Sequence, residues 1–94
     1  MVYFLATIYF DKDKTCEYSE YIEKVVPIVK KYKGRYIVRS EKITPLGEEW
    51  NPNRVIIIEF DSKEHLETCF SSKEYREIAS LREQSVISNA IIIE

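Results

Sequence analysis

The sequence contains few of the residues from which common catalytic and cofactor-binding motifs are built. Gly34 and Gly47 are the only glycines among 94 residues, which excludes a glycine-rich loop around phosphates. His65 is the only histidine, and Cys16 and Cys69 are too far apart for a CxxC or metal-ligand motif. We therefore expect no protein-only metal site and no cofactor.

Long apolar runs and an excess of positive charge are also missing. No stretch approaches the ~20 apolar residues that span a bilayer, and the apolar start lacks the basic segment of a signal peptide. The 14 basic and 16 acidic side chains give a net charge of −2, whereas phosphate binding requires clustered positive charge. We expect a cytoplasmic protein with two reduced thiols and with neither a membrane nor a nucleic-acid partner.

The apolar residues that are present predict four strands and two helices in one domain, residues 1–94. In the first helix, apolar residues recur at three- and four-residue steps up to Gly34, which we expect to end it as a left-handed residue. We expect the second helix to break at Ser71-Ser72 and restart, and Ser88-Asn89 to form a turn. The predicted strands are residues 2–10, 35–40, 54–60 and 90–94.

The order of these elements is βαββαβ, which predicts a ferredoxin-like α+β fold. Right-handed crossovers place both helices on one face of a four-stranded antiparallel sheet. Strands such as Val55-Ile56-Ile57-Ile58 are apolar on both faces, and monomers rarely expose a large apolar patch. We therefore expect an obligate homodimer in which two sheets pack face to face.

The chain resembles a known family over nearly its whole length. The residues that carry the resemblance are 31–39, Trp50, Pro52, Arg54, 58–62, 72–75 and 81–82. They are similar to the family called domain of unknown function 1330, which belongs to the dimeric α+β barrel superfamily. The resemblance implies a homodimer with a cleft between helices and sheet, and it implies no particular activity. The chain departs from the family at Lys33-Gly34, in place of Gly-Gly, and at Cys69-Phe70, in place of Trp-Tyr.

Four residues are candidates for binding a ligand. Arg39 and Glu59 fall on strands expected to be neighbours, where they form a structural ion pair or, alternatively, Arg39 binds a ligand carboxylate and Glu59 orients it. Trp50 and Arg54 flank a turn before the third strand. They form an aromatic and cationic cleft rim or, alternatively, an exposed arginine beside a tryptophan at the edge of the core.

His65 and Tyr75 are the candidates for proton transfer. Histidine is a natural general base near neutral pH, although a lone histidine at a helix start is more often a solvated surface residue. Tyr75 and Arg82 match the family pattern, and core packing together with a helix-to-sheet salt bridge explains them equally well.

Two functions remain open on the sequence. The first is binding or transformation of a small acidic or aromatic metabolite in the cleft. The second is a non-catalytic dimer that senses a ligand or serves as a structural module. An RNA-binding module is disfavoured, because the segment Lys33 to Val38 lacks the stacking aromatics of an RNA-recognition motif.

Overall fold

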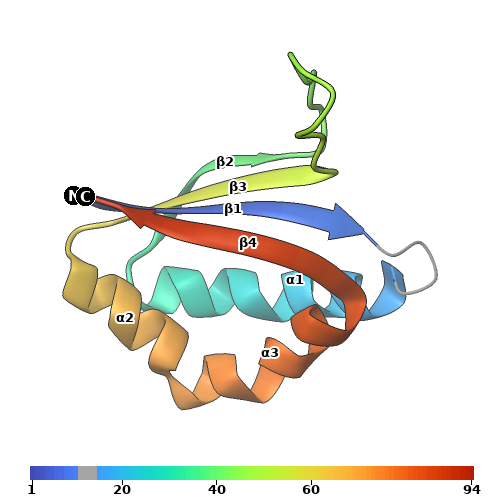
Figure 1. Ribbon diagram of the computed structural model, residues 1–94. Coiled ribbons are helices and arrows are strands. Elements are labelled where there is room, and N and C mark those ends of the chain that lie inside the picture. Colours follow the sequence, from blue (N-terminus) through green and yellow to red (C-terminus); the bar gives the residue numbers. More distant parts are fainter. Residues whose placement is uncertain (11–14) are drawn as a thin grey trace.

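The computed structural model describes residues 1–10 and 15–94 and contains a four-stranded sheet and three helices (Figure 1). No helix in this part of the chain is long and apolar enough to cross a membrane. On the sequence, Asp13 or Thr15 can cap the first helix, and Asp13 lies outside the described residues. The elements are β1 (Val2–Phe10), α1 (Thr15–Lys31), β2 (Arg35–Ser40), β3 (Arg54–Phe60), α2 (Lys63–Ser71), α3 (Lys73–Ser85) and β4 (Val86–Ile93).

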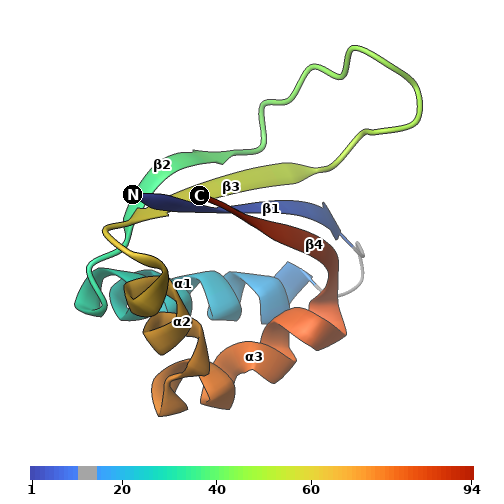
Figure 2. The same cartoon turned by 60° about the vertical axis from the view of Figure 1, so that its left-hand side comes forward.

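The molecule has two layers, with the sheet on one side and all three helices on the other (Figures 1 and 2). The strand order is β2-β3-β1-β4, and each neighbouring pair is antiparallel. The predicted ferredoxin-like α+β fold is confirmed. Both long crossovers return over the same face, as right-handed connections require, so the opposite face receives no helix from the described residues.

Helix α1 ends in a Schellman motif, but the residue with a left-handed conformation is not the predicted one. Lys33 has φ 67°, while Gly34 does not have a positive φ. The N–H of Gly34 donates to the carbonyl of Val29 at 2.8 Å, as this motif requires. Gly34 serves a different purpose, because a Cβ there would lie 2.6 Å from Val29 Cγ1 and 2.8 Å from Phe60 Cε1.

The predicted break in the second helical segment is confirmed, so the described residues form three helices instead of two. Ser72 separates α2 from α3 and acts at both ends. Its backbone N–H donates to the carbonyl of Cys69, and its hydroxyl accepts a hydrogen bond from the N–H of Tyr75. An N-cap serine of this kind satisfies one of the first unpaired N–H groups of a helix, which lets α3 start in a new direction.

The predicted turn at Ser88-Asn89 is wrong, because β4 begins at Val86 and runs through both residues. In the ladder, Val86 is opposite Phe10 and Asn89 is opposite Thr7. Pairing with β1 satisfies the backbone groups that a turn would otherwise satisfy locally. The preference of Ser and Asn for turns is therefore overridden by strand pairing.

The two faces of the sheet differ in what covers them. The helix-side face packs on the core, where Val29, Phe60 and Cys69 are fully buried. The opposite face is termed the open face. Its residues alternate along each strand with the core residues and lie opposite one another on neighbouring strands: Leu5, Thr7, Val55, Ile57, Ile91 and Ile93. Residues 41–53, termed the arm, connect β2 to β3 and project on the side of the open face (Figures 1 and 2).

Candidate functional site

A cavity of about 260 Å³ lies between the helices and the sheet. Most of its walls are apolar, and a few polar groups converge on it, which is the usual composition of a small-molecule site. The apolar lining residues are Phe4, Ala6, Ile8, Val25, Ile56, Ile58, Phe70 and Ala90, and the polar ones are Tyr21, Tyr36, Tyr75, Arg82 and Ser88.

Two tyrosines from different helices meet at the cavity wall. The hydroxyls of Tyr21 on α1 and Tyr75 on α3 lie 3.0 Å apart and share a buried hydrogen bond. Burial raises the pKa of Tyr21 above its ordinary value, and the neighbouring Tyr75 adds to this effect. The Tyr21 phenol therefore stays protonated at neutral pH. One hydroxyl of the pair can donate to the other and the second donor remains for a ligand oxygen.

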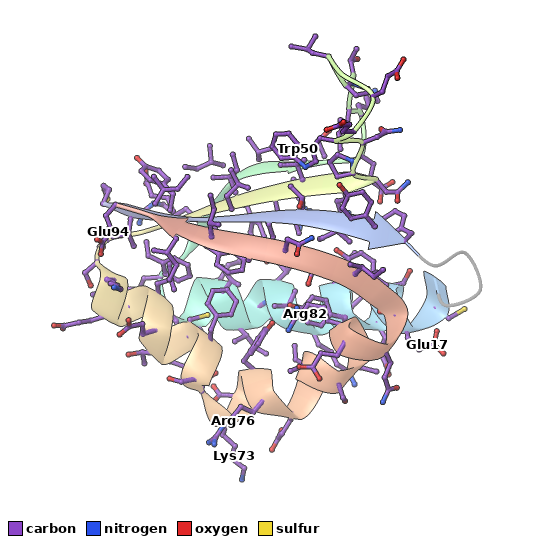
Figure 3. All side chains as sticks on the ribbon, in the orientation of Figure 1. Glu17, Trp50, Lys73, Arg76, Arg82 and Glu94 are labelled. Atoms are coloured by element: carbon purple, nitrogen blue, oxygen red, sulfur yellow. The ribbon has the colours of Figure 1, made fainter. Side chains whose placement is uncertain are left out.

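Arg82 is the only charged side chain among the described residues that line the cavity. It extends from α3 into the layer between the helix and the sheet, whereas Arg76 of the same helix points away from that layer (Figure 3). Its Nη1 donates to Ser88 Oγ on β4 at 2.6 Å. The predicted helix-to-sheet salt bridge is absent from the described ion pairs, where the carboxylate near Arg82 is that of Glu83, 3.8 Å away on α3 itself.

Arg54 is a buried residue beside this cavity, not an exposed loop arginine. Only 8% of its surface is accessible, and its ladder partner Ile8 lines the cavity. The guanidinium Cζ lies 5.9 Å from the ring centroid of Tyr18, and Nη1 donates to Glu41 Oε1 at 3.3 Å. Burial raises the pKa of Tyr18 to about 12, and the positive charges of Arg54 and Arg82 oppose that rise.

The predicted pairing between Arg39 and Glu59 is wrong. Glu59 is opposite Arg35, whose Nη2 lies 2.9 Å from Glu59 Oε1 on the open-face side. Arg39 is four residues further along β2, opposite Ile56, and a register shift between Tyr36 and Val38 turns it to the helix side. There its Cζ lies 5.3 Å from the ring centroid of Tyr36, a residue of the cavity wall.

Trp50 and His65 lie away from the cavity. Trp50 belongs to the arm, is 64% exposed, and is on the opposite side of the sheet from Arg82 (Figure 3). His65 is exposed at the start of α2, where its Nδ1 lies 2.7 Å from the hydroxyl of the N-cap residue Ser62. Of the six residues predicted for a site, the cavity itself includes Tyr75, and Arg39 and Arg54 flank it.

Sequence reasoning did not select Tyr21, Tyr36 or Ser88 for the site. Tyr21 and Tyr36 lie within apolar patterns that predict core packing, and Ser88 fell in a predicted turn. A usable signal existed for Arg82, because it continues the inward stripe of Tyr75 and Ile78 at helical spacing. A charged residue on an apolar stripe needs a partner, which makes it a candidate for binding. Phe70, at a departure from the family pattern, stacks on Phe4 at 4.5 Å and forms part of the wall.

Comparisons with known proteins agree with this architecture. A protein of unknown function from Rhodopseudomonas palustris is 17% identical and has a TM-score of 0.82, with 98% of this chain and 79% of that chain covered. The cofactor-independent oxygenase SnoaB from Streptomyces nogalater is 12% identical, with a TM-score of 0.68 over 99% and 90% of the two chains.

An uncharacterized NIPSNAP domain protein from Burkholderia xenovorans is 13% identical, with a TM-score of 0.70 over 100% and 93% of the chains. These identities show a shared fold alone. No curated protein matches the sequence. The family described as a domain of unknown function (DUF1330) matches residues 1–94, and the chain, which has a ferredoxin-like fold, therefore belongs to that family.

Proposed function

We propose that this protein binds a small acidic or aromatic metabolite in the cavity between the helices and the sheet. The observation that carries the proposal is the composition of the cavity, in which apolar walls surround the Tyr21–Tyr75 hydroxyl pair and the Arg82–Ser88 pair. Apolar walls supply affinity, and a few fixed polar groups supply orientation.

The size and shape of the cavity limit the ligand. A volume of about 260 Å³ falls just below the ~300–1,000 Å³ typical of ligand pockets, so a compound of one or two rings is the expected size. Phe70 meets Tyr75 edge to face at 5.0 Å and stacks on Phe4, so aromatic surface lines one wall. Such walls favour a flat, ring-containing ligand. Tyr75 is the group that we propose to donate a hydrogen bond to a ligand oxygen.

The test is a thermal-shift screen with small carboxylates, lactones and phenols, run on the wild type and on Ala90→Leu. Ala90 lies on the edge strand β4 and lines the cavity. A leucine at this position should therefore occupy part of the cavity without overpacking the hydrophobic core. A ligand at 100 times its Kd adds about 2.7 kcal/mol of stability, which raises Tm by several degrees in a domain of this size. Equal shifts in both proteins, or none in the wild type, would contradict the proposal.

The assembly that we propose is a homodimer formed through the open face. Ile91 is 57% exposed and Ile93 is 43% exposed, and the arm adds the fully exposed Leu46. A second copy packed sheet to sheet would cover these side chains, and each arm would then reach the partner's surface. Sedimentation equilibrium at micromolar concentration tests this, and a stable monomer would contradict it. We place the protein in the cytoplasm, which agrees with Cys16 and Cys69 both being free thiols.

A further inference from the structure

We infer that the natural ligand is an aromatic carboxylate. Its acid group is bound by Arg82, and Arg54 and Tyr18 supply further hydrogen-bond donors nearby. The inference rests on the proposed function and narrows it, because a cavity of this kind accepts neutral as well as acidic ring compounds unless a charge selects between them.

The first argument is the balance of charge. The described residues lining the cavity include one cation and no carboxylate. Glu83 is 3.8 Å from Arg82 and its side chain is 65% exposed, so water screens much of that attraction. Glu41, the partner of Arg54, is likewise largely exposed. The Arg82 side chain is itself 30% exposed, so water solvates part of the guanidinium, and the part that faces the apolar cavity favours an anion as its partner.

The second argument is a set of hydrogen-bond donors on Arg82, in the cavity wall, and on the neighbouring residues Arg54 and Tyr18. Three atoms are buried and have no hydrogen-bond partner among the described residues, namely Arg82 Nε, Arg54 Nε and Tyr18 Oη. Buried polar groups are almost always paired, and arginine is able only to donate. The guanidinium Cζ of Arg54 lies 5.9 Å from the ring centroid of Tyr18, so these two residues are direct neighbours. A ligand that pairs with these unpaired donors must supply hydrogen-bond acceptors.

A carboxylate fits these requirements better than a neutral acceptor. Its two oxygens offer about four lone-pair positions and match the planar fork of arginine in a two-point contact. The remainder of the ligand would lie against the aromatic wall formed by Phe4, Phe70 and Tyr75. An aromatic monocarboxylate combines both properties in a molecule small enough for the cavity.

The experiment compares each acid with its neutral amide of nearly the same shape. Benzoate and 1-naphthoate, with benzamide and 1-naphthamide, are titrated by calorimetry into the wild type, Arg82→Met and Arg76→Met. Arg76 lies on the same helix and points away from the cavity, so Arg76→Met is the matched control for loss of one positive charge (Figure 3). Thermal unfolding without ligand establishes that each variant is folded.

We expect the wild type to bind each acid at least tenfold more tightly than its amide, because hydrogen bonds to charged groups are the stronger ones. Arg82→Met should remove that preference, and Arg76→Met should retain it. Equal affinity of the wild type for acid and amide overturns the inference and leaves the proposed function standing; this comparison needs no variant. A preference that survives in Arg82→Met also overturns it. Failure of all four compounds to bind the wild type overturns the inference together with the proposed function.

Discussion

Both faces of the sheet carry apolar side chains, but only one face is covered by helices of the described chain. On the helix side, Phe4, Ile58 and Phe60 pack under three helices and leave a cavity with several polar groups in its wall. On the open face, Leu5 and Ile57 pair across the ladder with no helix of the described chain above them. The comparison shows that apolar side chains alone do not indicate whether a face of the sheet binds a ligand or another protein surface. The helix-side face has converging donors, which suit a ligand, whereas the open face has a broad apolar patch, which suits another sheet.

The largest expected effect is the loss of the proposed dimer when a charge enters the open face. Ile57 lies opposite Leu5 and Val38 at the middle of that face. Ile57→Asp would bury an unpaired carboxylate between the sheets, at a cost of several kcal/mol. We expect a monomer at micromolar concentration in sedimentation equilibrium. Ser80→Asp, at an exposed position of α3, is the control and should leave the assembly unchanged. A folded Ile57→Asp protein that remains dimeric would show that the open face is not the interface.

The second prediction uses the two glycines, which test how tightly the helix side is packed. A Cβ at Gly34 would meet Val29 and Phe60 at under 3 Å, whereas nothing lies within 4 Å of one at Gly47 in the arm. Overpacking typically costs about 1–3 kcal/mol, so Gly34→Ala should lower the free energy of unfolding in urea by that amount. Gly47→Ala should stay within about 0.5 kcal/mol of the wild type. Equal effects at both positions would contradict this difference between the core and the arm.

The third prediction concerns the hydroxyl pair in the cavity wall. Tyr75→Phe leaves the buried Tyr21 hydroxyl without its partner, which should destabilise the protein by about 1–2 kcal/mol. Tyr21→Phe combined with Tyr75→Phe removes both polar groups and should cost less than the two single changes added together. Urea unfolding of all four proteins measures the coupling. Strict additivity would mean that the two hydroxyls do not stabilise each other.

The smallest effect is expected at high pH and arises from buried phenols on the helix side. Burial raises the pKa of Tyr18 and of Tyr36 from 10.0 to about 12. Between these values the unfolded chain releases protons that the native state retains, so native stability falls as the pH rises from about 10 to 12. Below pH 10 the contribution is fully present. Urea unfolding at pH 8, 10 and 11 should show a smaller fall in the free energy of unfolding with pH for Tyr18→Phe than for the wild type. An identical pH dependence in the two proteins would contradict this prediction.

Local patterns explain why much of the fold was predictable. The three- and four-residue spacing along α1, the serine at the start of α3 and the apolar runs of the strands each depend on neighbours in sequence. The errors arose where distant contacts decide the outcome. Strand pairing with β1 outweighs the turn preference at Ser88. The close approach of Val29 and Phe60 to the backbone of Gly34, not a left-handed conformation, requires glycine there.

The candidate site was less predictable, because it depends on register. Arg39 and Glu59 were predicted to lie together because they fall on neighbouring strands. The antiparallel ladder instead places Arg35 opposite Glu59. The register shift in β2 then directs Arg39 to the other face of the sheet. A slip of one residue exchanges the faces of a strand, and no local pattern in a two-sided apolar strand specifies which face a residue takes.

By itself, the sequence determined the element order, the ferredoxin-like class and the presence of an apolar second face, since each follows from periodicity and connection rules. Only the tertiary structure decided which side chains share a space. It brought Tyr21, Tyr75 and Arg82 to one cavity and placed Trp50 on the opposite side of the sheet. The physical reason is that a binding site is assembled from residues distant in sequence, whose side-chain directions depend on strand register and helix packing and not on local preference.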